Sequence, residues 1–233
     1  AASFILPETL SLERRTDHGV AKAARVYGSL IRDPRYLAPA VLAGSTYVVL
    51  FAYISTSPAV MLDFFGMDEL GFAILFGFLS LCYALGAQLN SRLLKSFDVI
   101  PLIVVFVVIQ AAAAAILLID AIAAPTLLVV SVSIGVAMTT IGVTSANSTA
   151  LCLDPFPRAA GSAAALLGLI GMSVGAIVSS SLVAIHLPVV TELGTAMLIG
   201  AGIGLATLPF LLRRQSSSAG SNDSASSAAH SVE

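Results

Sequence analysis

Charged side chains are missing from most of this 233-residue chain. Only 10% of the residues are Asp, Glu, Lys or Arg, against about a quarter in an ordinary globular domain. The hydrocarbon core of a bilayer is about 30 Å thick, and a helix needs about 20 residues to cross it. Six longer runs contain none of these four residue types: Tyr36–Met61, Leu70–Ser91, Val99–Ile119, Ala121–Leu153, Ala159–Thr191 and Leu193–Leu212. We therefore predict an all-α membrane protein with six transmembrane helices.

Lys and Arg are absent from every second connection between these runs. The 11 cations are Arg14, Arg15, Lys22, Arg25, Arg32 and Arg35 before the first run, Arg92 and Lys95 after the second, Arg158 after the fourth, and Arg213 and Arg214 after the sixth. The opposite connections carry acidic residues and His186 instead. Because cations concentrate in cytoplasmic loops, we predict an integral membrane protein with both termini in the cytoplasm.

Cysteine and histidine are too scarce to suggest catalysis or metal binding. Cys82 and Cys152 stand alone within apolar runs, which gives neither a metal-ligand spacing nor a disulfide framework, so we expect both to be buried in helix packing. An intramembrane protease would need a Ser and a His facing each other inside the membrane. His186, the one His away from the termini, lies in an outer loop. We therefore predict a protein that is not an enzyme, with no metal, cofactor or nucleic-acid partner.

The two ends of the chain differ from its centre. Residues 1–6 are apolar and typical of the last turns of a preceding helix, which Pro7 would end. Residues 8–35 are charged and amphipathic, which suits a cytoplasmic linker at the membrane surface. Ser and Ala dominate from Gln215 onward, which predicts disorder. We divide the chain into a helix end with the linker (1–35), a six-helix bundle (36–212) and a disordered cytoplasmic tail (213–233).

Polar residues inside the runs repeat every three runs. Helical spacing places Thr46, Tyr53 and Ser57 on one face of the first run, and Thr140, Thr144 and Asn147 on one face of the fourth. The third and sixth runs are nearly free of polar residues between their ends. This pattern predicts a three-plus-three inverted repeat, in which the first helix of each triplet lines a transport pathway and the third faces lipid.

Each of these polar residues also has a purely structural interpretation. A Ser or Thr hydroxyl usually bonds to a carbonyl one turn earlier in its own helix. Asn147 has more hydrogen-bonding groups than its helix can satisfy, so it should face either a partner helix or a wet cavity, and we weigh these two equally. The pairs Gly171/Gly175 and Gly200/Gly204 have the GxxxG spacing that predicts close helix packing.

One stretch carries a family resemblance. Residues Asn147 to Gly168, NSTALCLDPFPRAAGSAAALLG, resemble the segment from helix ten to helix eleven in the bicyclomycin and chloramphenicol resistance type of drug/proton antiporters of the major facilitator superfamily. Leu6–Leu10 with Glu13–Arg15 is similar to the start of that family's central cytoplasmic loop, and Phe51–Pro58 to its seventh helix. Asn90–Arg92 resembles its loop between helices eight and nine, although Asn90 replaces the acidic residue of that motif.

The resemblance implies the carboxyl-terminal half of a twelve-helix secondary transporter in the bacterial inner membrane, active in multidrug efflux by drug/proton antiport. Its partners would be the amino-terminal six-helix half, the lipid bilayer, protons and a small hydrophobic drug-like substrate. The side chains expected to contact substrate are Phe51, Tyr53, Ser57, Tyr83, Thr140, Thr144, Asn147 and Met172.

Proton coupling needs a titratable group in the pathway. The six runs contain no acidic residue, and the resemblance implies that the coupling carboxylate belongs to the other half. The alternative is a complete six-helix protein that works as a homodimeric transporter or as a scaffold.

Overall fold

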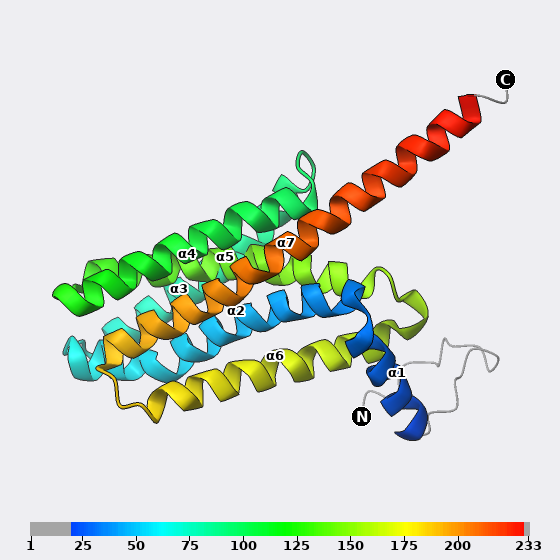
Figure 1. Cartoon of the computed structure of the whole chain (residues 1–233). Coiled ribbons are helices and arrows are strands. Elements are labelled where there is room, and N and C mark those ends of the chain that lie inside the picture. The colour runs from blue at the N-terminus through cyan, green and yellow to red at the C-terminus, as the bar shows by residue number, and fades with distance from the viewer. Residues whose placement is uncertain (1–19, 231–233) are drawn as a thin grey trace, which may run out of the picture.

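The computed structural model describes the backbone of residues 20–230 and the side chains of residues 25–157 and 159–213. All regular structure in this part of the chain is helical (Figure 1). The elements are α1 (Val20–Arg32), α2 (Pro34–Pro58), the π-helical turn η3 (Ala59–Phe64), α3 (Glu69–Leu93), α4 (Val99–Ala123), α5 (Leu127–Leu153), the 3-10 turn η4 (Pro157–Ala159), α6 (Ala160–Val183) and α7 (Val189–His230).

Six of these helices are long and apolar enough to cross a membrane, which confirms the predicted fold class. Two of the helices are shorter than the sequence prediction, both because of a proline. The fourth helix begins at Leu127 rather than at Ala121, after a break that contains Pro125. The fifth ends at Val183, and the chain turns before Pro188. Proline has no backbone N–H to donate within a helix, so apolar composition alone overestimates the length of these two helices.

Contacts between helices follow a twofold repeat. The helix α2 packs extensively against α6 and α7, and α5 packs in the same way against α3 and α4. If α2, α3 and α4 are exchanged with α5, α6 and α7 respectively, the α2–α6 contact becomes the α5–α3 contact, and the α2–α7 contact becomes the α5–α4 contact. The packed pairs α2–α5 and α4–α7 map onto themselves. This is the packing expected of a three-plus-three repeat.

Glycines set the closest approaches between helices. A Cβ added at Gly86 of α3 would overlap the carbonyl oxygen of Thr139 in α5. The corresponding pair of helices in the repeat is α6 and α2. A Cβ at Gly171 of α6 would lie 2.5 Å from the Tyr47 ring of α2, and a Cβ at Gly175 would lie 2.9 Å from the Tyr47 carbonyl oxygen. A Cβ at Gly200 of α7 would come within 3.0 Å of the Ser45 carbonyl oxygen. The predicted packing role of both GxxxG pairs is therefore confirmed.

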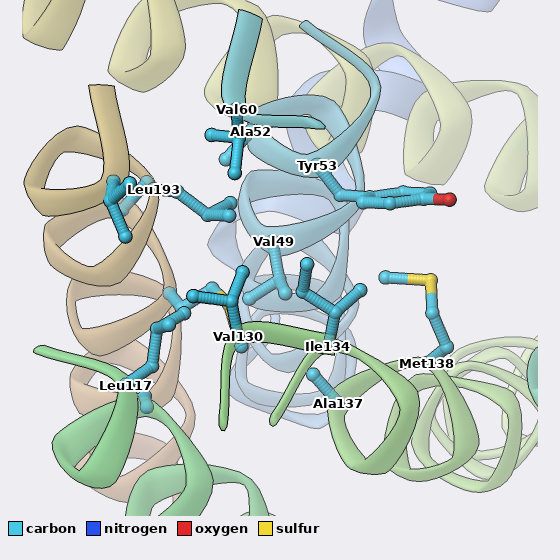
Figure 2. Packing of buried hydrophobic residues seen from close by; sticks show 14 of the residues in the cluster. Val49, Ala52, Tyr53, Val60, Leu117, Val130, Ile134, Ala137, Met138 and Leu193 are labelled. Atoms are coloured by element: carbon cyan, nitrogen blue, oxygen red, sulfur yellow. The ribbon is translucent and has the colours of Figure 1, made fainter. Parts of the chain in front are cut away.

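The apolar core lies between α2, α4, α5 and α7. Figure 2 shows Val49 and Ala52 of α2 packed with Leu117, Ile134 and Leu193 from the other three helices. By contrast, α3 is the least buried of the six spans. Its exposed apolar face includes Leu70, Ile74, Phe78 and Leu81.

The helix α1 lies on the end of the bundle where the cations are. Val26, Tyr27 and Leu30 pack against α6, while Arg25 and Arg32 are exposed. Asp33 then begins α2, because its side chain accepts a hydrogen bond from the Arg35 backbone N–H at 2.8 Å. The assignment of residues 1–35 to a helix end and a cytoplasmic linker stays a prediction, and residues 1–19 lie outside the described part of the chain.

The end of α7 differs from the prediction of a disordered tail. The helix continues to His230, and its last turns project beyond the other helices (Figure 1). Ala is a strong helix former, which favours this continuation. A helix without tertiary packing is only marginally stable in water. The division between the six-helix bundle and a disordered tail at residue 213 therefore stays a prediction.

Candidate transport site

A pocket of about 390 Å³ lies between α2 and α5, the first helices of the two triplets. The second helices of the triplets, α3 and α6, complete its walls. Its lining consists of Ala43, Thr46, Tyr47 and Leu50 from α2, Tyr83 and Ala87 from α3, Ile141, Gly142, Ser145, Ala146 and Thr149 from α5, and Leu167 from α6. The sequence pattern predicted that the first helices of the two triplets, α2 and α5, line a pathway, and both line this pocket.

Hydroxyl groups and two tyrosine rings supply the polar and stacking groups of this otherwise aliphatic pocket. The Tyr83 hydroxyl lies 3.5 Å from Ser145 Oγ, a long contact that a ligand can replace. Thr149 donates a 2.7 Å hydrogen bond to the Ser145 carbonyl, and Thr46 donates one of the same length to Ala43. All described lining residues are uncharged. The pocket is therefore suited to neutral or weakly polar molecules that stack on a ring and accept or donate a few hydrogen bonds.

The eight predicted substrate contacts do not all meet in this pocket. Tyr83 lines it, and Phe51 is half-buried beside Gly175, close to the Tyr47 backbone. Thr140 lines a different cavity of about 400 Å³ between α3, α4 and α5. Met172 is 57% exposed on α6. The binding roles of these residues stay predictions.

Three predicted contacts are buried with unpartnered hydroxyls. Tyr53, Ser57 and Thr144 are all at most 3% exposed, and their oxygens have no hydrogen-bond partner. Tyr53 stacks on Phe76 of α3 at a centroid distance of 5.2 Å, and its ring extends to the same side of the core as Met138 (Figure 2). Such unsatisfied groups are rare in proteins and call for a functional or structural explanation.

The structural interpretation of the polar faces therefore holds for some residues and fails for others. Thr46 and Thr140 donate to carbonyls of their own helices, at 2.7 Å and 2.8 Å. Ser57 and Thr144 do not make such bonds. The sequence alone could not separate the two groups, because side-chain rotamers decide between them.

Sequence reasoning missed Tyr47 and Ser145. Gly142, Ser145 and Thr149 recur at intervals of three and four, which places them on one face of α5. A second face of the same helix carries Thr140, Thr144 and Asn147, and the sequence prediction chose this face because it is the more polar one. The small residue Gly142, three positions before Ser145, is the signal that could have identified the face that lines this pocket.

Asn147 faces a partner helix. Its side-chain amide donates to the Asn90 side chain of α3 at 2.8 Å, and the Asn90 amide donates back at 3.0 Å. Both side chains are at most 5% exposed. Asn90 lies one turn after Gly86, so this reciprocal pair fastens α3 to α5 next to their closest backbone approach. The helix-packing alternative explains the position of Asn147, and its contact with substrate stays a prediction.

We predict that replacing either partner alone destabilises the protein more than replacing both. Asn147→Leu or Asn90→Leu leaves one buried amide without its partner, at a cost of about 1–3 kcal/mol in the free energy of unfolding. The double variant removes both polar groups and should recover part of that loss. Melting temperatures of the four proteins in detergent measure this coupling; strictly additive losses would contradict the pairing.

The sequence prediction of spans free of acidic residues is wrong at four positions. Asp63, Glu69 and Asp120 lie at or near the ends of the first three spans, and Glu192 is the fourth case. The helix α7 begins at Val189, so Glu192 lies in its first turn inside the sixth span. The sequence placed that span at Leu193–Leu212. Glu192 is half-buried, and the positive end of the helix dipole favours a carboxylate there. It lies at the end of the bundle opposite Arg35 and Arg213.

Comparisons with known proteins agree with the membrane fold. No family model matches the chain. A search of curated proteins finds an uncharacterized MFS-type transporter, YdgK of Bacillus subtilis (strain 168), which is 32% identical over 199 residues. The match covers 85% of this chain and 49% of the relative, so the chain spans about half the length of the curated relative it matches. The chain is thus similar to a transporter of the major facilitator superfamily (MFS) over 85% of its length.

Proposed function

We propose that this chain forms the carboxyl-terminal half of a major facilitator secondary transporter that exports small hydrophobic drug-like molecules in exchange for protons. The observation that carries the proposal is the uncharged pocket between α2 and α5. Its walls come from the first two helices of each triplet, where transporters with such repeats bind substrate. The similarity to an MFS-type transporter supports the same function.

The substrate would lie against Tyr47, Tyr83 and Ser145. The two tyrosine rings offer stacking surfaces, and the loosely paired Tyr83 and Ser145 hydroxyls offer hydrogen bonds. Phe51 and Met172 would extend the adaptable apolar surface. The unpartnered hydroxyls of Tyr53, Ser57 and Thr144, together with Thr140 and Asn147, would come within reach only after the helices move between transport states.

The other half of the transporter would cover the exposed faces of α3 and α6. These faces carry Phe78 and Leu81 on α3, and Leu169 and Met172 on α6, all at least half exposed. An amino-terminal six-helix unit would bury them and close the pocket from the opposite side. The chain matches 49% of the YdgK length, so that relative has room for a second unit of similar size. A second copy of this chain is the alternative partner, because the same apolar faces also suit a homodimer.

Coupling to protons would depend chiefly on a carboxylate of the other half. The described pocket lining has no titratable acid or base that changes charge near neutral pH. Glu192 is the described carboxylate of α7 that enters a span, and it lies away from the pocket lining. We therefore expect Glu192→Gln to retain proton-coupled transport in the full-length protein.

Proton flux in proteoliposomes tests the proposed antiport. A pH gradient is imposed across the liposome membrane. When chloramphenicol is added, the full-length protein should move protons down this gradient in exchange for the drug. This chain alone should insert in the bilayer but show no drug-dependent flux, and co-expression with the amino-terminal half should restore part of it. Flux through this chain alone would refute the half-transporter proposal and favour the homodimer.

The proposed orientation places both termini in the cytoplasm of a bacterium, with the protein in its inner membrane. Single cysteines at the exposed positions Asp68 and His186, introduced in a variant lacking Cys82 and Cys152, should react with an impermeant thiol reagent added outside intact cells. A cysteine at the exposed position Lys95 should react only after the membrane is permeabilised. Labelling of the cysteine at position 95 in intact cells would contradict this orientation and indicate the opposite one.

A further inference from the structure

The ring of Tyr47 lies between α6 and the pocket that α2 and α5 form. Tyr47 is half-buried in α2 and lines this pocket together with Ser145 and Thr149 of α5. On its other side the ring lies against α6, where a Cβ added at Gly171 would be 2.5 Å and 2.6 Å from its Cδ2 and Cε2 atoms. The ring is therefore one wall of the pocket, and α6 supports that wall from behind.

The missing side chain at Gly171 makes room for this ring. Carbon atoms in favourable contact are about 3.5–4.0 Å apart, so any Cβ at Gly171 would require the ring to retreat by about 1 Å. Gly171 is buried in the interior of α6, where glycine is a weaker helix former than alanine. The space that the Tyr47 ring occupies accounts for glycine at this position.

The group that would yield at Gly171 is a side chain and not the backbone. In the corresponding contact of the repeat, a Cβ at Gly86 of α3 would meet the backbone of Thr139 in α5. At Gly171 the three closest atoms all belong to the Tyr47 ring. A ring can turn about its side-chain bonds while the helices stay in place. Moved away from α6, it would take up part of the pocket volume of about 390 Å³.

We propose that Gly171 is a specificity-determining residue of this pocket, because it lets the Tyr47 ring lie against α6 and so sets the largest molecule that fits beside Ser145. This proposal rests on the proposed function, which places the substrate in the same pocket. The favoured substrates are uncharged molecules with a flat ring that stacks on Tyr47. A larger residue at position 171 would restrict the pocket to smaller molecules, although Gly171 does not itself line it.

Thiol labelling measures the width of the pocket without any transport. A cysteine replaces Ser145 in a full-length protein that lacks its other cysteines, and its reaction rates with ethyl methanethiosulfonate and with the bulkier benzophenone methanethiosulfonate are compared in detergent. Adding Gly171→Ala should slow the bulky reagent at least about ten-fold, because the displaced ring crowds the space that this reagent needs. The rate of the ethyl reagent should stay nearly unchanged.

Two further variants separate displacement of the ring from other effects of the added methyl group. Gly168→Ala is the matched control on α6, because a Cβ there would meet nothing within 4 Å, and it should leave both labelling rates unchanged. Tyr47→Ala combined with Gly171→Ala should restore the rate of the bulky reagent, because no ring remains to be displaced. Transport of chloramphenicol should fall in Gly171→Ala and persist in Gly168→Ala.

Equal labelling by the bulky reagent with and without Gly171→Ala would overturn this proposal and leave the proposed function standing. A loss of labelling that Tyr47→Ala does not restore would also overturn it, because the helices rather than the ring would then have moved. If labelling is lost and restored as expected but Gly171→Ala transports chloramphenicol normally, the substrate does not use this pocket. That result would refute the proposed function together with the specificity role of Gly171.

Discussion

Replacing Gly86 by alanine is expected to destabilise the bundle, although the same change stabilises most helices. A Cβ at this position would overlap the Thr139 carbonyl oxygen and lie 2.9 Å and 3.0 Å from its carbonyl carbon and Cα. These are backbone atoms, so α3 and α5 would have to separate. Overpacking of this kind costs about 1–3 kcal/mol, which exceeds the gain of about 1 kcal/mol from helix propensity.

Gly202→Ala is the matched control for this prediction. A Cβ at Gly202 of α7 would meet nothing within 4 Å, so only the gain in helix propensity remains. The melting temperature in detergent should fall for Gly86→Ala and stay level or rise for Gly202→Ala. At about 2–4 °C per kcal/mol for a chain of this size, the difference is measurable. Equal melting temperatures would contradict the close contact between α3 and α5.

The fold could be predicted from the sequence because the membrane constrains it strongly. A span must exclude charge over about 20 residues, and the distribution of Lys and Arg then fixes which ends lie together. The errors arose where this rule gives no signal. Pro125 and Pro188 interrupt apolar runs without adding charge, and Glu192 falls inside a helix because α7 begins before the apolar run does.

The candidate site could be predicted only in part, because polarity does not fix how a helix is rotated in the bundle. The face of α5 with Thr140 and Asn147 is the more polar one, yet Asn147 bonds to Asn90 and Thr140 lines another cavity. Ser145 and Tyr47 line the pocket, and each lies near a close glycine contact between helices. The backbone contact of Gly142 with α3 and the packing of Tyr47 on Gly171 determine that rotation.

Filling the pocket is expected to abolish most transport without unfolding the protein. Ser145 is half-buried and faces the Tyr83 hydroxyl across the pocket. In Ser145→Trp the indole would occupy the space proposed for substrate between α2 and α5. Losing even about 1.4 kcal/mol of binding reduces affinity ten-fold, so efflux of chloramphenicol should fall at least about ten-fold.

The most direct test compares this variant with Val105→Trp in the full-length protein. Val105 is 52% exposed on α4 and does not line the pocket, so its replacement adds the same side chain away from the proposed site. Initial rates of proton-driven chloramphenicol transport are measured in proteoliposomes at equal amounts of inserted protein. We predict that Val105→Trp retains transport and Ser145→Trp loses it. Undiminished transport by Ser145→Trp would contradict the assignment of this pocket to the transport pathway.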